Sequence, residues 1–320
     1  MTQARFTNRR AIVALGGNAI TVAHLEDTIA NQFANTRRSL TPIVELVRQG
    51  YDLCITHGNG PQVGNALLRV ELARTKAPEL PLGICVADTE GGMGYMIEQS
   101  LQNRLDHEGI DRKVCTIISQ LVVDPDDPSM KNPTKYIGQF YSEAEARQLA
   151  TERGWMVKED GARGWRRVVP SPVPTTCVEK DIIRLLLDHH CVVIAAGGGG
   201  IPVYLDEKLG YEGVDAVIDK DRASAVLGRE IGAEVFWILT SVDQVALDFG
   251  KPGQRLLEEV TVSEIERYFA AGHFPPGSMG PKVEAAIDFL KQGGREVIIT
   301  SFDKAAEAVA GRAGTRIYSD

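Results

Sequence analysis

Short apolar runs alternate with longer helix-patterned stretches along most of this chain, and no other feature of the sequence constrains its fold as strongly. The runs have the length of buried strands, and the stretches between them repeat apolar residues at helical spacing. Such alternation is typical of an α/β protein with a mostly parallel sheet and helices on both faces. The expected strands are Ala11–Leu15, Leu53–Thr56, Val114–Ile118, Cys191–Ala196, Val235–Leu239 and Val297–Thr300, and the expected helices include Leu40–Arg48, Met96–Leu105, Glu143–Glu152, Lys180–Asp188 and Val283–Leu290.

Residues 124–170 interrupt the alternation with a proline-rich stretch and a charged stretch that contains two tryptophans. We interpret this segment as an inserted subdomain or lid that projects from the sheet. Most of its charges are expected to form a solvated face. Lys135 is treated differently, because NPTKYIG places it on a loop constrained by proline and glycine, where functional side chains are commonly presented.

Three of the expected strands run directly into glycine-rich turns. In a parallel sheet such turns lie at the carboxyl ends of strands, where ligands bind, and glycine lets backbone N–H groups approach an anion closely. The turns therefore predict a phosphate site. Two alternatives stay open: turns that serve only close packing, and a dinucleotide fingerprint at GGGG, which is disfavoured because IPVYL continues as extended chain. The residues concerned are Gly16, Gly17 and Asn18 in the first loop, Gly58, Asn59 and Gly60 in the second, and Gly197, Gly198 and Gly199 in the third.

Two lysines close to expected helix starts are candidates for neutralising phosphate charge. We expect a short strand that ends at Asp219-Lys220-Asp221 and a helix from about Ala223. Lys220 can face the phosphate while a neighbouring carboxylate orients lysines or holds the water shell of Mg²⁺. The alternative is a helix cap with surface ion pairs. Lys282 lies near the first turn of another helix, where a cation opposes the helix dipole unless an anion binds nearby.

The sequence favours phosphoryl transfer over covalent or zinc chemistry. No segment pairs a nucleophile with a base, and none of the six histidines has zinc-ligand spacing. His57 lies in the second loop, where we interpret it as structural. Glycine loops with lysines and without a nucleophile favour catalysis by positioning and charge neutralisation. The stretch VFWILTSVDQVALDFGKP is a candidate wall for a nucleotide base or ribose, although an ordinary buried strand with an exposed turn explains it equally well.

Composition excludes several other classes of protein. A net charge of −8 and a pI of about 5.4 argue against a surface that binds nucleic acid. The five cysteines are scattered and never form C-x-x-C, which indicates reduced thiols in a cytoplasmic protein. A signal peptide is disfavoured because the first apolar run ends in Gly-Gly-Asn, and no run approaches membrane-spanning length. The 320 residues suit one or two domains.

A series of motifs, in order and over nearly the whole chain, resembles the carbamate kinase branch of the amino-acid kinase superfamily. The motifs are LGGNA, ITHGNGPQVGN, NPTKYIG, VVPSP, VIAAGGGGIPV, VIDKDRAS, ILTSVD, FGKP and HFPPGSMGPKVEAA. The resemblance implies an open αβα sandwich in three layers. It further implies an acceptor-binding lobe at residues 1–213, a nucleotide-binding lobe at residues 214–320, and a protruding subdomain at about 124–170.

The resemblance also implies an activity. Members are homodimers that use Mg²⁺ to interconvert ATP plus carbamate with ADP plus carbamoyl phosphate, and the implied direction here is ATP formation in catabolism, within arginine metabolism. The first and second loops would cradle the acceptor and the transferred group, and Asp221 would organise Lys220 and Lys282 while Lys135 reaches in from the lid. The nucleotide site would be lined by Thr240, Asp243, Gly277, Ser278 and Met279.

Departures from the family pattern cluster on the acceptor side. Glu90 stands where the family usually has glutamine, Tyr136 and Gln139 replace common prolines, and Val173 replaces a common lysine. ITVAHLED replaces a basic, glycine-containing segment after the first loop. We therefore predict that nucleotide binding is retained while carbamate turnover is altered or the acceptor differs.

Two alternative functions remain beside carbamate kinase. One is a kinase of the same fold for another small carboxylate or carbamoyl-like acceptor, which Glu90 and Val173 favour. The other is a catalytically idle regulatory homologue. The second is disfavoured, because a chain without catalysis has no chemical reason to keep Lys220, Asp221 and Lys282 together.

Overall fold

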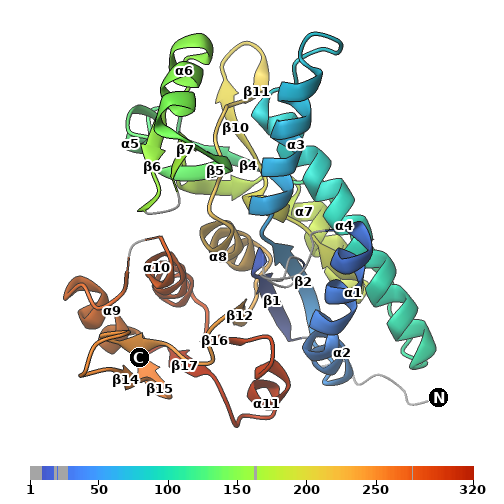
Figure 1. Cartoon of the computed structure of the whole chain (residues 1–320). Coiled ribbons are helices and arrows are strands. Elements are labelled where there is room, and N and C mark those ends of the chain that lie inside the picture. Colours follow the sequence, from blue (N-terminus) through green and yellow to red (C-terminus); the bar gives the residue numbers. More distant parts are fainter. Residues whose placement is uncertain (1–8, 18–19, 21–27, 162–163, 276) are drawn as a thin grey trace.

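The computed structural model describes residues 9–17, 20, 28–161, 164–275 and 277–320 (Figure 1). An eight-stranded sheet lies at its centre. The pairing of β16 and β17 is antiparallel and every other pairing in this sheet is parallel, as the alternation in the sequence predicts. In spatial order the strands are β15 (Glu259–Thr261), β17 (Thr315–Tyr318), β16 (Glu296–Ser301), β12 (Val235–Thr240), β1 (Arg10–Leu15), β2 (Asp52–His57), β9 (Val192–Ile194) and β3 (Val114–Thr116).

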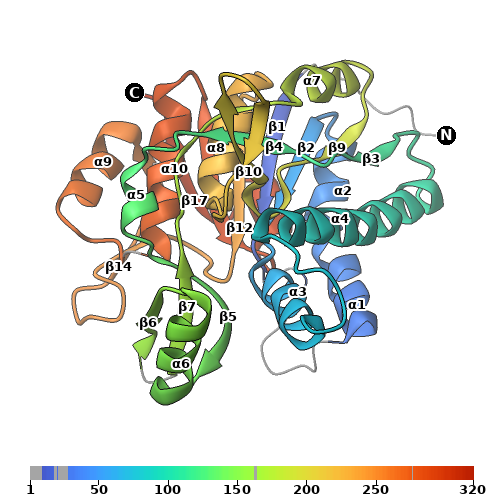
Figure 2. The ribbon, with the colours of Figure 1, turned by 90° about the horizontal axis from the view of Figure 1, so that it is seen from above.

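Helices cover both faces of this sheet and complete an αβα sandwich (Figure 2). None of the helices in the described ranges is long and apolar enough to cross a membrane. One face is covered by α7 (Lys180–Asp188), α8 (Lys220–Glu230), α9 (Val262–Ala270) and α10 (Met279–Lys291), and the other by α1 (Ile29–Ser39), α2 (Thr41–Arg48), α4 (Leu82–His107) and α11 (Ala305–Val309).

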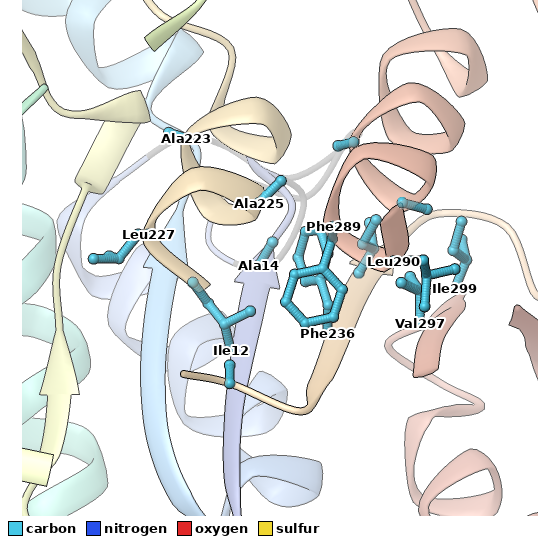
Figure 3. Packing of buried hydrophobic residues seen from close by; sticks show 14 of the residues in the cluster. Ile12, Ala14, Ala223, Ala225, Leu227, Phe236, Phe289, Leu290, Val297 and Ile299 are labelled. Atoms are coloured by element: carbon cyan, nitrogen blue, oxygen red, sulfur yellow. The ribbon is translucent and has the colours of Figure 1, made fainter. Parts of the chain in front are cut away.

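Alternate residues of the central strands enter two separate cores, because successive side chains of a strand point to opposite faces. In β1, Ile12 and Ala14 pack with α8 and α10, whereas Ala11 and Val13 pack toward α2 and α4. Phe236 of β12 and Phe289 of α10 meet edge to face, with ring centroids 5.4 Å apart (Figure 3). Truncating Phe289 to alanine would cost about 3–5 kcal/mol of stability.

The expected insertion forms a small subdomain that projects beside α3 (Gly60–Ala73) (Figure 1). Arginines stack on its aromatic rings, with the Arg167 guanidinium 4.9 Å from the Trp155 ring and that of Arg147 5.7 Å from the Trp165 ring. The subdomain contains a three-stranded sheet, β5 (Lys135–Tyr141), β7 (Trp165–Val169) and β6 (Val157–Glu159), with α5 (Pro128–Lys131) and α6 (Glu143–Arg153). A second sheet, β11 (Gly210–Gly213), β10 (Ile201–Asp206), β4 (Gln120–Val123) and β8 (Pro174–Cys177), lies next to it, and β13 (Ala246–Leu247) pairs with β14 (Arg255–Leu256).

Of the expected elements, one helix is longer than predicted and one expectation, a strand before Asp219, is wrong. The helix expected at Met96–Leu105 is part of the longer α4, which begins at Leu82 and runs through Gly91, Gly92 and Gly94. The strand expected before Asp219 is absent from the described residues 214–219, and α8 begins at Lys220 rather than at about Ala223. The backbone of residues 214–219 bonds to other loops instead, with the Val217 amide donating to the Pro170 carbonyl.

Candidate active site

The three glycine loops converge because they follow neighbouring strands β1, β2 and β9. The Gly58 amide donates to the Leu15 carbonyl at 3.0 Å, and the Gly16 amide donates to the Leu239 carbonyl at 2.9 Å. A Cβ on Gly58 would lie 3.4 Å from the Gly17 nitrogen, so the first two loops nearly touch. Gly60 opens α3, and a Cβ there would meet nothing within 4 Å. Asn18 lies outside the described residues.

The third loop is a buried 3-10 turn at Gly197–Gly199 that packs directly behind the second. A Cβ on Gly197 would lie 2.4 Å from His57 Nε2, and one on Gly198 would lie 2.2 Å from Asn59 Nδ2. One on Gly199 would lie 2.4 Å from the Ile218 carbonyl oxygen. Glycine is therefore required here for close approach of backbone to protein, which is the packing alternative that the sequence left open.

Helix α4 fixes the second loop through Thr89. Asn59 Nδ2 donates to Thr89 Oγ1 at 2.9 Å, and Thr89 Oγ1 donates to the Val86 carbonyl at 2.7 Å. The Asn59 side chain is only 4% exposed. Its side-chain amide is thus used inside the protein. Thr89 is a supporting residue that its sequence context did not reveal.

His57 is buried and neutral. Burial lowers its pKa to about 4, although the neighbouring Gly58 carbonyl favours the protonated form. Its Nδ1 lies 3.2 Å from the Gly58 oxygen, which fits an Nδ1–H donor that braces the loop. The geometry agrees with the structural role expected for this residue.

Asp221 joins the two predicted lysines at one point. Lys220 Nζ lies 2.5 Å from Asp221 Oδ1, and Lys282 Nζ lies 3.0 Å from Asp221 Oδ2. The carboxylate is 2% exposed, and the lysine side chains are 12% and 17% exposed. Asp221 is the nearby anion that offsets the unfavourable position of Lys282 at the start of α10. Both cations are thus fixed beside the glycine loops, since Lys220 Cδ lies 3.3 Å from where a Gly58 Cβ would be.

Helix α8 places this cluster accurately at the end of β2. Asp219 caps the helix by accepting from the Asp221 amide at 3.0 Å, and Ser224 Oγ lies 2.6 Å from Thr56 Oγ1 of β2. Burial lowers the pKa of Lys220, whereas Asp221 raises it and Lys282 lowers it further. The charge of Lys220 therefore depends on Asp221.

Lys135 reaches from the first residue of β5 to the same region, as the sequence predicted, although it starts a strand rather than lying in a loop. Its Nζ lies 2.9 Å from Asp219 Oδ2. Burial raises the pKa of Asp219, but Lys135 and Lys220 outweigh it and hold that pKa well below its usual range. This ion pair links the subdomain to α8, and the sequence did not reveal the partner of Lys135.

A cavity of about 320 Å³ leads from the lysine cluster into the carboxyl-terminal half of the chain. Thr240, Ser278 and Met279, which the resemblance assigns to the nucleotide site, line this cavity, and Lys282 lies at its edge with the cluster. Asp243 lines an adjacent cavity instead, and Gly277 does not line this one. Further lining residues, which the sequence analysis did not single out, are Ser241, Val242, Gln244, Ala246, Phe249 and Pro275. Phe249 belongs to the FGKP motif and is 61% exposed, as suits a residue that meets a ligand.

Of the four single-residue departures from the family pattern, Glu90 alone lies against the glycine loops, and the replaced segment ITVAHLED at residues 20–27 lies outside the described residues except for Ile20. Its Cγ would be 3.1 Å from a Cβ on Gly197. Tyr136 donates its hydroxyl to the Glu159 carbonyl within the subdomain, Gln139 lines a small cavity against α3, and Val173 is half exposed in a groove beside α8 and α10.

The carboxylates of the site engage lysines and form no metal cage. Within the described ranges, no group of three histidine, cysteine, aspartate or glutamate residues is placed to hold a metal ion. The described residues therefore provide no resident metal centre. A divalent cation with few protein ligands is typical where phosphate oxygens and water complete the shell.

Comparisons with known proteins agree with this geometry. Residues 9–301 match the amino acid kinase family. A carbamate kinase of Pyrococcus horikoshii is 46% identical over 96% of this chain and 98% of its own length, and the carbamate kinase-like protein YahI of Escherichia coli is 45% identical over 96% and 98%. The solved structure of a Giardia lamblia carbamate kinase bound to AMP-PNP superposes with a TM-score of 0.91 and 41% identity, covering 98% of this chain and 99% of that one.

Fold, site and kinship point the same way: the chain belongs to the amino acid kinase family, in the branch of the carbamate kinases and carbamate kinase-like proteins.

Proposed function

We propose that this chain is a carbamate kinase, an ATP-dependent phosphotransferase that interconverts ATP plus carbamate with ADP plus carbamoyl phosphate. The observation that carries the proposal is the Lys220–Asp221–Lys282 cluster, which lies between the glycine loops and the cavity lined by Thr240 and Met279. The similar carbamate kinases and the solved carbamate kinase structure of the same fold support this activity.

The reaction suits a site that has cations but no general base. A carboxylate oxygen of carbamate forms the new bond to the γ-phosphorus, while the bond to the oxygen between the β- and γ-phosphorus breaks and that oxygen leaves with ADP. The attacking oxygen is already ionised, so no proton has to be removed. Buried, neutral His57 therefore has no proton-transfer role to fill.

Charge neutralisation and positioning supply the catalysis. Negative charge spreads over the transferring group, and Lys220 and Lys282 approach it from α8 and α10. The Gly16 and Gly58 amides bond to strand carbonyls, so the amides of Gly17 in the first loop and Gly60 in the second would hold the acceptor and the phosphoryl oxygens. Lys135 would add a third cation from the subdomain by exchanging Asp219 for a phosphate oxygen.

Mg²⁺ is proposed to enter with the nucleotide, bound chiefly by phosphate oxygens and water. When bound it would neutralise charge on the nucleotide phosphates. The proposal agrees with the absence of a metal-binding cluster in the described part of the chain. The protein's own contribution is the lysine cluster.

A cytoplasmic homodimer is proposed as the working form, acting in the ATP-forming direction of arginine catabolism. The five cysteines are all free thiols, which suits a reducing compartment. Helix α4 exposes Ile84 and Tyr95, which are 47% and 56% exposed, and apolar surface of this kind suits contact with a second copy.

A second candidate is a kinase of this fold for another carboxylate or carbamoyl-like acceptor. The observation that favours it is Glu90, an acidic residue against the third loop. Relatives at 45–46% identity include carbamate kinase-like proteins as well as carbamate kinases. The nucleotide half would be unchanged in this case.

The deciding experiment is ADP-dependent ATP formation from carbamoyl phosphate with Mg²⁺, with Lys282→Ala as the matched control. We expect activity that the substitution lowers by about 10²-fold or more. Absent activity together with retained ADP binding would reject carbamate kinase and favour the second candidate. A panel of small carboxylates with ATP would then identify the acceptor class.

A further inference from the structure

Glu90 is a buried acid that pairs with no cation among the described residues. Its side chain is on α4 and only 2% exposed. Oε2 accepts from the Ser119 amide at 3.0 Å, whereas Oε1 has no hydrogen-bond partner among the described residues. None of the described ion pairs includes it. A buried carboxylate normally has a cation or several donors around it, so this environment needs an explanation.

Ser119 connects Glu90 to both ends of the third loop. Its hydroxyl accepts from the Ala196 amide at 2.9 Å and donates to the Ile117 carbonyl, and its carbonyl accepts from the Ile201 amide at 2.8 Å. The glycine turn lies between Ala196 and Ile201. Ala196 has φ +49°, which a residue other than glycine adopts only where its surroundings hold it. Ser119 supplies that hold, and Glu90 fixes Ser119.

The groups around Glu90 do not compensate a negative charge. His57 on β2 is neutral, Glu179 before α7 is itself acidic and accepts from the Gln120 amide, and Lys220 on α8 faces the second loop. Burial raises the pKa of Glu90 well above its usual range and Glu179 raises it further, although the Ser119 and Gly197 amides oppose the shift.

We propose that Glu90 acts as a neutral carboxylic acid that positions the third glycine loop, so that its ionisation loosens the turn between Ala196 and Ile201 and slows phosphoryl transfer. The activity part of this inference rests on the proposed function. A neutral carboxyl keeps the oxygen that Ser119 uses without burying an unpaired charge. An ionised one attracts water or rotates away, which releases Ser119 and the turn.

Activity as a function of pH tests this positioning role. We would compare wild type, Glu90→Gln, Glu90→Ala and the control Glu98→Gln, which changes an acid elsewhere on the same helix, in ATP formation from carbamoyl phosphate. Glu90→Ala should lower kcat/KM by about 10²-fold by displacing the loop, and Glu90→Gln should keep more activity at neutral pH. The alkaline fall in kcat/KM should begin at lower pH in wild type than in Glu90→Gln.

Lys220 also loses its charge at high pH, but it does so in every variant, so the difference between wild type and Glu90→Gln isolates Glu90. Identical alkaline limits in these two proteins would overturn the proposal. If Glu90→Ala fails to fold, the isosteric glutamine variant still decides the question.

A direct readout does not depend on the substrate. Infrared difference spectra should show the C=O stretch of a protonated carboxylic acid at neutral pH in wild type and in Glu98→Gln, but not in Glu90→Gln. Hydrogen exchange at residues 196–201 should rise with pH, beyond its intrinsic dependence, in wild type and in Glu98→Gln but not in Glu90→Gln. Loss of activity with carbamoyl phosphate but retention of these signals would reject the proposed function and keep Glu90. Absence of the stretch would reject the neutral acid, whatever the activity.

Discussion

Replacing Asp221 with asparagine removes the carboxylate that Lys220 and Lys282 share. The two Nζ atoms lie 2.5 and 3.0 Å from its oxygens in a nearly buried position. Each pair is worth on the order of 4 kcal/mol of attraction at the effective dielectric constant of a protein surface. Asparagine keeps one acceptor oxygen, but turns an N–H₂ group toward the other lysine. We expect water to compensate part of the lost attraction, so that kcat falls by about 10²-fold.

The same substitution should shift the pH profile in a defined direction. Burial and Lys282 lower the pKa of Lys220, and Asp221 opposes them. Without that carboxylate Lys220 should lose its proton at lower pH, so the alkaline fall in activity should move toward neutrality. We would measure kcat and kcat/KM for ATP formation from carbamoyl phosphate across the alkaline range, with circular dichroism to verify folding.

The matched control is Asp181→Asn, which removes the same charge from an 80% exposed position on α7. It should leave both kcat and the pH profile unchanged. A loss smaller than about threefold in Asp221→Asn, or under ~0.7 kcal/mol of transition-state stabilisation, would refute the view that Asp221 organises the two cations.

Three further perturbations test other parts of the site. Because the pKa of His57 falls from 6.5 in the unfolded chain to about 4 in the fold, the free energy of unfolding should decrease by up to about 3 kcal/mol as pH falls through this window. Thermal denaturation should show this decrease in wild type and in the exposed-site control His107→Gln, but not in His57→Gln. Equal pH dependence in all three proteins would contradict a buried neutral histidine. Gly198→Ala would place a Cβ 2.2 Å from Asn59 Nδ2 at φ +67° and should destabilise the protein by about 1–3 kcal/mol. The control Gly253→Ala, with open space around its Cα, should leave the urea denaturation midpoint unchanged. Equal urea midpoints for the two variants would disprove the close packing at Gly198. Phe249→Ala should raise KM for ADP by about tenfold at constant kcat, whereas Phe269→Ala on α9 should not, and an unchanged KM would remove Phe249 from the nucleotide site.

The central strands could be predicted because they are buried on both faces and are therefore apolar without interruption. β1, β2, β12 and β16 lie within one or two residues of the expected limits. Helix α4 was underestimated because its glycines argue locally against a helix. Tertiary packing requires glycine at position 94, because a Cβ there would lie 2.3 Å from Thr116 Cγ2 at the end of β3. Packing against a distant strand leaves no local signal.

Much of the candidate site was also predictable, because glycine loops and lysines at strand ends are local patterns. Asp221 pairs with both Lys220 and Lys282, which is the arrangement that the resemblance implies. The pairing of Lys135 with Asp219 and of Asn59 with Thr89 depends on how separate elements dock, which spacing does not reveal. The expected strand before Asp219 failed for the same reason, because apolar pattern alone does not show whether a neighbouring strand is free to pair.

The pairing of β1 with β12 makes the folding of residues 1–213 and of residues 214–320 interdependent. Ala11 pairs with Val235 and Leu15 with Leu239 in the middle of the sheet. A cut between residues 213 and 214 would leave each fragment with a bare apolar edge, so the separate fragments should aggregate and regain structure only by complementation when they are mixed.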